Sequence, residues 1–268
     1  MQVAFDHLVH FIQVHPQQAV KQMSMLGLHA VAGGRHENWG TFNSLCYFDL
    51  SYIEFLGLEH PDVAEQAREY GLIDQLLLDL PKGEGLGTIA LRTDNMEESA
   101  AILRSKGIRV RGPFPGSRQR SDGRVISWKM LFLERESDDL PLPFFIQWEQ
   151  TDEERRADLA QNGIIAPHPA GEIALDYVAY AVGDLDKTGK QWQDLFSLEA
   201  KEPYFHKQWG ATCQILSLTG GNLLFCQPEG KGIVSEVLQK RGERPFLVNL
   251  RGADIHKVNY ISGSIYQL

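Results

Sequence analysis

The sequence predicts an α+β fold made of repeated units that each contain one strand, one helix and several further strands (βαβββ). Three segments of the chain share this order, and their first strands contain His7, Thr88 and Tyr177. Between corresponding positions of the first and last strands, the first and third units both span 47 residues. The middle unit spans 59 residues because it contains a long loop around 112–124. Self-similarity at a nearly fixed spacing indicates the duplication of one structural unit.

Turn and cap residues set the limits of the individual elements. The first strand is followed by a helical pattern that ends before Gly27, and Pro61 opens a connecting helix. In the second unit Asp94, with Glu97 three residues later, predicts the start of a helix. The helix of the third unit is expected at 184–195. The strands that close the three units are expected at 52–55, 145–148 and 223–226, and a further helix and strand at 234–238 and 244–250.

The units are unequally distributed along the chain. Residues 1–150 contain two units and are expected to form one domain, followed by a helix and a linker at 151–171. Thr151 and Glu154 have the spacing of a capping box, which predicts the start of that helix. Residues 172–268 contain the third unit and part of a fourth, because too little chain remains for a complete one. Pairing with a second copy in a homodimer is one way to complete it.

His7 and Glu54 are the first candidates for chemistry. Because alternate side chains of a strand share one face, Phe5, His7 and Val9 are expected on the same side of the first strand. Glu54 is expected to face the same cavity from the strand that closes the unit. An imidazole and a carboxylate on facing strand interiors form either a metal site or an acid–base pair. The structural alternative is a buried ion pair or a core histidine.

A polar run at 33–43 separates these two strands. If 41–48 is a strand, Thr41 and Asn43 share a face and supply the few orienting hydrogen bonds of a small-molecule pocket. Trp39, together with Trp128 of the second unit, then forms apolar walls. In the alternative interpretation the asparagine satisfies loop backbone groups and the tryptophans belong to the core. The substrate-binding candidates of this run are Arg35, His36, Trp39, Thr41 and Asn43.

The long loop of the second unit contains three arginines within seven residues, Arg118, Arg120 and Arg124. Proline and glycine residues around them predict a loop. Arginine recognises carboxylates and phosphates through two parallel hydrogen bonds. Arg120 and then Arg118 are therefore candidates for an anion clamp at the mouth of the cavity. The alternative is a solvated loop whose arginines pair with acidic residues of the surface.

The chain resembles the vicinal oxygen chelate superfamily and, within it, the glyoxalase-like group. The residues that carry the resemblance lie at 5–9, 33–43, 52–55 and 118–128. The resemblance covers 1–150 well, whereas 172–228 match only in the outline of a βαβββ unit. It implies that two units pair to form a curved sheet cup, and that a divalent metal is held by the first and last strands of each unit.

Carried over to this chain, the resemblance implies metal-ligand positions at His7 and Glu54, and at Thr88 and Gln147 in the second unit. A threonine is a poor ligand, and the amide oxygen of Gln147 is a modest one. A zinc site normally has three or four protein ligands, and a non-haem iron site has two histidines and one carboxylate. His36 could add a second imidazole if its loop folds over the cup. A divalent ion (Zn²⁺, Fe²⁺, Mn²⁺ or Ni²⁺) and a metal-free cup both remain open.

Two classes of function follow. The first is a small-molecule metalloenzyme of the lyase, isomerase or dioxygenase type, in which His7 and Glu54 are catalytic and the substrate is oxygen-rich or anionic. The second is a metal-free protein that binds or sequesters a small molecule, as bleomycin-resistance members of the superfamily do. The poor donors expected in the second unit favour the second class. No organic cofactor is expected in either case.

Composition excludes several other classes. The net charge of −9 argues against general nucleic-acid binding, which depends on clustered lysines and arginines. No apolar run approaches the ~20 residues that span a bilayer, and no signal peptide is evident at the start. The three cysteines (Cys46, Cys213 and Cys226) are scattered and without metal-binding spacing. We therefore expect a cytoplasmic protein whose partner is a small molecule.

Overall fold

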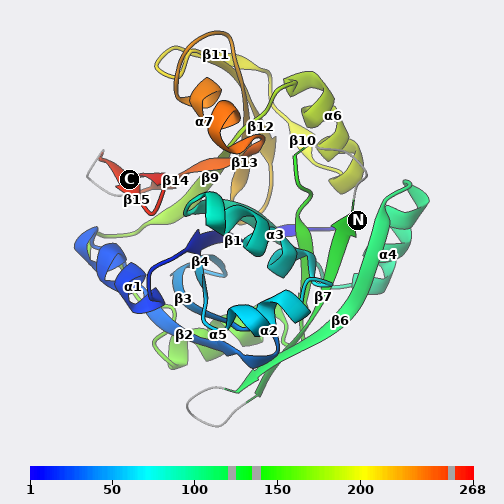
Figure 1. Cartoon of the computed structure of the whole chain (residues 1–268), viewed down its shortest axis with the longest axis vertical. Helices are drawn as coiled ribbons and strands as arrows, with labels where there is room; N and C mark the ends of the chain where they lie inside the picture. Colours follow the sequence, from blue (N-terminus) through cyan, green and yellow to red (C-terminus); the bar gives the residue numbers. More distant parts are fainter. Residues whose placement is uncertain (120–124, 135–139, 253–256) are drawn as a thin grey trace.

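The computed structural model describes residues 1–119, 125–134, 140–252 and 257–268. Its first sheet has eight strands in the order β2-β3-β4-β1-β5-β8-β7-β6 and curls strongly around one open side (Figure 1). We call the concave side of this sheet the cup. The strands are β1 (Ala4–Ile12), β2 (Val31–His36), β3 (Thr41–Phe48), β4 (Ser51–Leu58), β5 (Gly85–Arg92), β6 (Arg109–Gln119), β7 (Val125–Glu134) and β8 (Phe144–Trp148).

The second sheet has the order β10-β12-β13-β9-β14-β16-β15, and β11 pairs with β12. Its strands are β9 (Ala174–Ala181), β10 (Glu199–Ala200), β11 (Tyr204–His206), β12 (Ala211–Ser217), β13 (Asn222–Pro228), β14 (Arg244–Arg251), β15 (Val258–Ile261) and β16 (Ser264–Gln267).

Seven α-helices cover the two sheets in the described part of the chain. They are α1 (Pro16–Met25), α2 (Pro61–Gln66), α3 (Gly71–Asp79), α4 (Met96–Ser105), α5 (Asp152–Gln161), α6 (Leu185–Phe196) and α7 (Ile233–Arg241), with short 3₁₀ turns at Glu37–Trp39 and Leu80–Lys82. None of them is long and apolar enough to cross a membrane.

Strand pairing confirms the predicted α+β fold of repeated units. In each of the first three units the opening strand runs parallel to the closing one, as β1–β4, β5–β8 and β9–β13. The opening strands of neighbouring units pair antiparallel, as β1–β5 and β9–β14. A fourth set, β14 to β16, repeats the plan with a parallel β14–β16 pair and, among its described residues, no helix between the strands. The division into separate domains at 151–171 stays a prediction.

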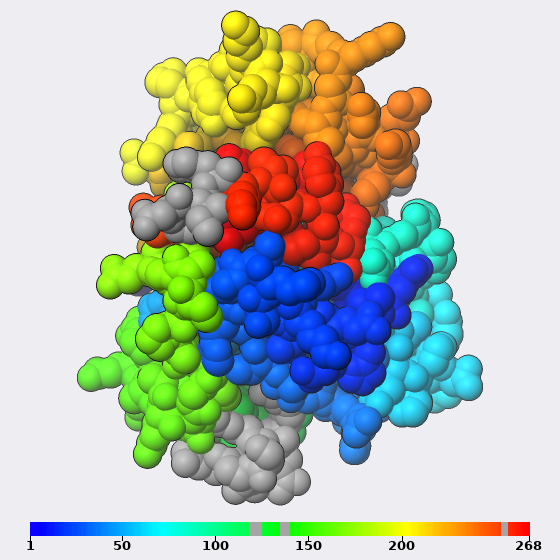
Figure 2. Space-filling view, turned by 90° about the vertical axis from the view of Figure 1, so that its left-hand side faces the viewer, coloured from blue at the N-terminus to red at the C-terminus, as the bar shows by residue number. Residues whose placement is uncertain are grey.

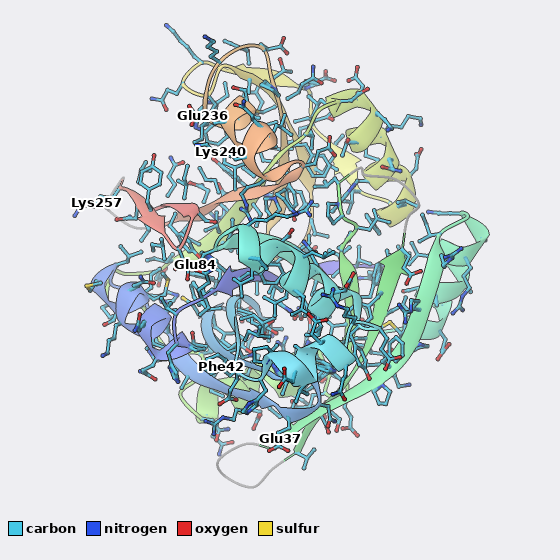
Figure 3. The ribbon with its side chains drawn as sticks, viewed as in Figure 1. Glu37, Phe42, Glu84, Glu236, Lys240 and Lys257 are labelled. Atoms are coloured by element: carbon cyan, nitrogen blue, oxygen red, sulfur yellow. The ribbon has the colours of Figure 1, made fainter. Side chains whose placement is uncertain are left out.

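The two sheets share one apolar core. It combines Phe5 and Leu8 of the first sheet with Tyr180 and Tyr266 of the second, and α1, α4 and α6 pack into it. The C-terminal strands lie against the N-terminal segment, as the contact between red and blue in Figure 2 shows. Glu84 lies at this junction (Figure 3), where its carboxylate accepts a hydrogen bond from the backbone N–H of Gln13 at 2.7 Å.

A β-bulge corrects one expectation about the first strand. The pairing of β1 with β5 shifts register between Phe5 and His7. Phe5 therefore packs into the core between the sheets, whereas Val9 belongs to the apolar cluster inside the cup. The prediction that Phe5 shares a face with His7 and Val9 was wrong, because a bulge adds one residue to the strand and breaks the alternation of side chains.

Candidate functional site

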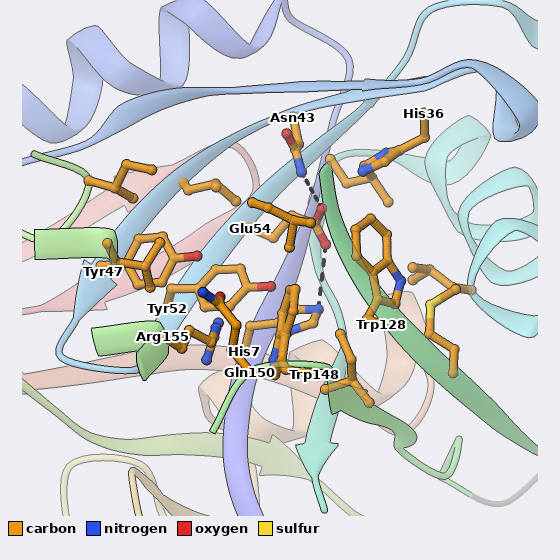
Figure 4. A pocket seen from close by; sticks show the side chains of 18 of the residues that line it. His7, His36, Asn43, Tyr47, Tyr52, Glu54, Trp128, Trp148, Gln150 and Arg155 are labelled. Atoms are coloured by element: carbon orange, nitrogen blue, oxygen red, sulfur yellow. Dashed lines mark hydrogen bonds and ion pairs between the residues drawn. The ribbon is translucent and has the colours of Figure 1, made fainter. Parts of the chain in front are cut away.

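The cup contains a cavity with predominantly apolar walls. Aliphatic and aromatic side chains reach it from β3, β4, β7 and β8, and α5 closes one side (Figure 4). Three tryptophans, Trp39, Trp128 and Trp148, line it, and the rings of Trp128 and Trp148 lie 5.6 Å apart. A few polar groups sit among these walls, centred on His7 and Glu54. This composition is typical of a small-molecule pocket.

His7 is held in one orientation by its neighbours. Its Nδ1 lies 2.7 Å from Asp6 Oδ1, and its ring stacks on Tyr52 with centroids 4.5 Å apart. The edge of the Phe144 ring packs against it at 5.4 Å. The other ring nitrogen, Nε2, points towards Glu54 Oε2 at 3.6 Å (Figure 4). The prediction that His7 and Glu54 face one cavity is therefore confirmed.

Glu54 is fixed from the opposite side by Asn43. The Asn43 side-chain amide donates to Glu54 Oε1 at 2.6 Å, and its carbonyl oxygen accepts from the backbone N–H of Gly34 at 2.8 Å. A side chain at Gly33 would collide with that carbonyl oxygen, so the glycine leaves the space that Asn43 occupies. The polar run at 33–43 thus positions the carboxylate.

Burial and the nearby carboxylates raise the pKa of Tyr52 well above its usual value, so its hydroxyl stays protonated at neutral pH.

Asp6 lies beneath His7 and is fully buried. Besides His7, its carboxylate accepts hydrogen bonds from Trp148 Nε1 at 2.9 Å, Arg92 Nη1 at 3.2 Å and Arg155 Nη1 at 3.4 Å. Burial alone would raise its pKa, but Arg155, His7 and Arg92 together hold the pKa well below its usual range. Asp6 is therefore a carboxylate at neutral pH and orients the imidazole.

Four of the predicted binding residues line the cavity together with His7 and Glu54. They are His36, Trp39, Asn43 and Trp128. Thr41 is buried and supports the site indirectly, since its hydroxyl lies 3.0 Å from His36 Nδ1. Arg35 lies outside the cavity, in a groove at its mouth, where it pairs with Glu59 at 2.8 Å.

Gln147 does not reach the cavity, so its prediction as a metal ligand was wrong. Its side-chain oxygen accepts from the backbone N–H of Met96 at 2.9 Å, and its amide donates to the carbonyl of Asp94 at 3.0 Å. It therefore holds the start of α4 on the outer face of β8. The neighbours Ile146 and Trp148 face the cup instead. The expected position was one residue out of register, which places a strand side chain on the opposite face.

Neither Thr88, the other expected ligand position, nor the arginine loop is seen to add a side chain to the cavity in the described part of the chain. Thr88 pairs with Val9 across β1 and β5, and Ala90 is the residue opposite His7. Arg120 and Arg124 lie outside the described residues, and Arg118 is described only by its backbone pairing with Ile126. The anion clamp at the mouth therefore stays a prediction.

The donor set does not fit a protein-held metal ion. His7 Nε2 and Glu54 Oε2 are two suitable donors, but no group of three or more histidine, cysteine, aspartate or glutamate side chains converges anywhere in the described part of the chain. Asp6 is not a third donor, because it contacts Nδ1 of the imidazole, away from Glu54, and pairs with Arg92 and Arg155. Two donors fall short of the three or four that zinc or non-haem iron takes from a protein.

Four residues of the site were not predicted as such, namely Asp6, Tyr52, Trp148 and Arg155. Two of them carried a usable signal, since Asp6 adjoins His7 and Tyr52 alternates with Glu54 on β4. Arg155 carried none. The capping box at Thr151 predicted the helix α5, but not which part of the protein that helix would contact. Only the folded chain brings it to Asp6, 149 residues earlier.

Comparisons with known proteins agree with this architecture. The sequence model of the glyoxalase-like domain family matches residues 5–196. A hypothetical protein from Staphylococcus aureus is similar over 99% of this chain and 98% of its own, with a TM-score of 0.80 and 24% identity. A mutant 4-hydroxymandelate synthase from Streptomyces coelicolor is similar over 93% of this chain and 71% of its own, with a TM-score of 0.57 and 12% identity. At these identities the two structures show the fold alone. No curated protein sequence matches significantly.

Proposed function

The chain belongs to the glyoxalase-like domain family of the vicinal oxygen chelate superfamily, as its sequence resemblance predicted, and on that premise we propose that its cup binds a small amphipathic molecule without a metal ion. The observation that carries this proposal is the asymmetry of the cavity. The first unit supplies Glu54 and His7, strands β7 and β8 of the second unit supply an apolar wall, and α5 adds Arg155 at one side.

The second unit offers apolar groups where further metal donors would be needed. Ala90 stands opposite His7, and the side chains of β8 that enter the cavity are Phe144, Ile146 and Trp148. A ligand with an apolar body gains by leaving water against these walls. Of the two function classes that the sequence left open, the metal-free one is therefore the better supported.

Binding can be followed by the fluorescence of the cavity tryptophans. We expect small aromatic probes such as phenylacetamide and benzyl alcohol to change this signal saturably, with the same affinity in EDTA as in added Zn²⁺. Trp128→Ala should weaken binding, because it removes part of the apolar wall. Trp209→Ala is the matched control, since Trp209 packs on Phe246 in the second sheet. An affinity that EDTA abolishes and Zn²⁺ restores would contradict the proposal.

A second candidate function is proton transfer on the bound molecule. It is favoured by the 3.6 Å between His7 Nε2 and Glu54 Oε2, which leaves both groups directed into the cavity without a good hydrogen bond between them. Glu54 would accept a proton from a carbon next to a carbonyl, and His7, protonated on both ring nitrogens with Nδ1 held by Asp6, would donate its Nε2 proton to the opposite side of that carbon or to the carbonyl oxygen.

Deuterium exchange separates this candidate from binding alone. We expect a carbonyl compound that binds the cup to incorporate deuterium from D₂O at the carbon next to its carbonyl. Glu54→Gln should abolish that exchange, since an amide is not a base at neutral pH, while leaving the probe bound. Exchange that continues at the wild-type rate in the folded variant would exclude Glu54 as the base.

A further inference from the structure

We propose that Arg155 is an anion-binding residue of the cavity and that the bound molecule carries a carboxylate. This inference rests on the proposed function, because it assigns one end of the ligand that the cup holds. Arg155 lies on α5, its side chain is only 3% exposed, and it lines the cavity together with His7 and Tyr52.

The guanidinium of Arg155 has hydrogen-bonding capacity that the protein does not use. Its side chain makes a hydrogen bond with Tyr47, and its Nη1 reaches Asp6 Oδ2 only at 3.4 Å. Its Nη2 is buried and, within the described part of the chain, has no hydrogen-bond partner. Buried polar groups in native proteins are almost always hydrogen-bonded, so such a donor indicates an acceptor that belongs to the site. A ligand oxygen is that acceptor.

Asp6 has three hydrogen-bond partners besides Arg155. Three shorter contacts already satisfy it, from His7 at 2.7 Å, Trp148 at 2.9 Å and Arg92 at 3.2 Å. Of the four donors around Asp6, Arg155 thus makes the longest contact. An incoming carboxylate can bind Arg155 without removing the groups that hold Asp6.

The orientation of Arg155 suits a planar anion. Its guanidinium carbon lies 4.1 Å from the centre of the Trp148 ring, so one flat face is covered by the indole. Hydrogen bonds from a stacked guanidinium leave in its plane, where the two oxygens of a carboxylate match its donors. A second carboxylate of α5, Asp158, also lines the cavity. It already accepts a hydrogen bond from the Asn162 side chain at 3.1 Å.

The positions of the groups give the ligand a direction. In Figure 4, Arg155 lies on one side of His7 and Glu54, and Trp128 lies on the other. A carboxylate at Arg155 therefore places an apolar body past the His7–Glu54 pair towards the Trp128 wall. The class that fits is a small monocarboxylate with an aromatic or aliphatic body.

The test compares acids with amides of the same shape. Phenylacetate and phenylacetamide form one pair, and indole-3-acetate and indole-3-acetamide form a second with a larger ring. In the wild-type protein, titration calorimetry should report affinities about tenfold or more higher for each acid than for its amide. Arg155→Gln should weaken binding of the acids about 10- to 100-fold, as expected for lost charged hydrogen bonds, and leave the amides within about twofold.

Arg156→Gln is the matched control, since it makes the same change one residue away on α5, where Arg156 is exposed and pairs with Asp49 at 2.6 Å. It should leave both pairs unchanged. Arg155→Lys should recover part of the preference for acids, because it keeps the charge but not the planar fork. If Arg155→Gln fails to fold, Arg155→Lys carries the same comparison, and the wild-type pairs still test whether the bound molecule is a carboxylate.

The outcomes separate this inference from the proposed function. Amides that bind as tightly as acids in the wild type would overturn the role of Arg155 and leave the proposed function standing. A preference for acids that survives in folded Arg155→Gln would also overturn it. If no member of either pair bound, the proposed function itself would be contradicted.

Discussion

His10 provides the clearest test of how the two sheets are joined. Its side chain is fully buried on the face of β1 opposite His7. Its Nε2 donates to the carbonyl of Ser262 at 2.8 Å, and its Nδ1 lies 2.6 Å from the hydroxyl of Tyr266, 256 residues away in the second sheet. In the neutral ring the tyrosine donates and Nδ1 accepts. Protonation of Nδ1 would remove that acceptor.

The expected effect is a loss of stability in mild acid. The pKa of His10 is lowered from 6.5 to about 4, chiefly by burial; Arg241 also lowers it, whereas the hydrogen bond to the Ser262 carbonyl and the Glu84 carboxylate act in the opposite direction. As the pH falls below 6.5, the unfolded chain takes up a proton that the folded protein binds only near pH 4. The free energy of unfolding therefore decreases through this window, by about 3 kcal/mol for this group when complete.

Urea unfolding of the wild type and of His10→Gln, at a series of pH values between about 7.5 and 4.5, measures this effect. The variant should be less stable at neutral pH but should lose about 2–3 kcal/mol less than the wild type on acidification. His60→Gln, a change at an exposed histidine on the surface, should follow the wild-type profile. If the wild type and His10→Gln lost stability in parallel, a neutral buried His10 would be refuted.

Two further substitutions test the polar groups of the cup. Gly33→Ala should push the Asn43 amide off Glu54 and lower the free energy of unfolding by about 1.5–3 kcal/mol, because it breaks a hydrogen bond to a charged group. Gly230→Ala, at an open position, is its control, and equal free energies of unfolding for the two alanine variants in urea denaturation would contradict that role. Asp6→Asn should lower the free energy of unfolding by about 3–5 kcal/mol at neutral pH, since it leaves buried guanidinium charge uncompensated. Urea denaturation measures it, and a loss below about 1 kcal/mol would show that the network is not stabilising.

Sequence patterns predicted the repeated fold because they are local. Alternating apolar strands, helix caps and a fixed spacing between His7 and Glu54 need no knowledge of how the sheet closes. The same reasoning predicted that His7 and Glu54 face one cavity, which both of them line. The expected strand at 41–48 placed Asn43 in the pocket, which it also lines.

The errors concern register and long-range contact. Gln147 was placed in the cup by counting along a unit of different length, and an offset of one residue moves a strand side chain to the other face. The bulge between Phe5 and His7 depends on pairing with β5, which lies about 80 residues later in the chain. Arg155 enters the site only because α5 packs against the open side of the cup, and nothing near it in the sequence indicates this.

The central claim is that the cup works without a metal ion held by its own residues. Elemental analysis of protein purified without chelators, and again after incubation with Zn²⁺, Mn²⁺, Fe²⁺ and Ni²⁺, tests it most directly when compared with a His7→Ala/Glu54→Ala double variant. We predict far less than one metal ion per chain in both proteins. Near-stoichiometric metal in the wild type that is lost in the double variant would contradict the claim and identify the cup as a metal site.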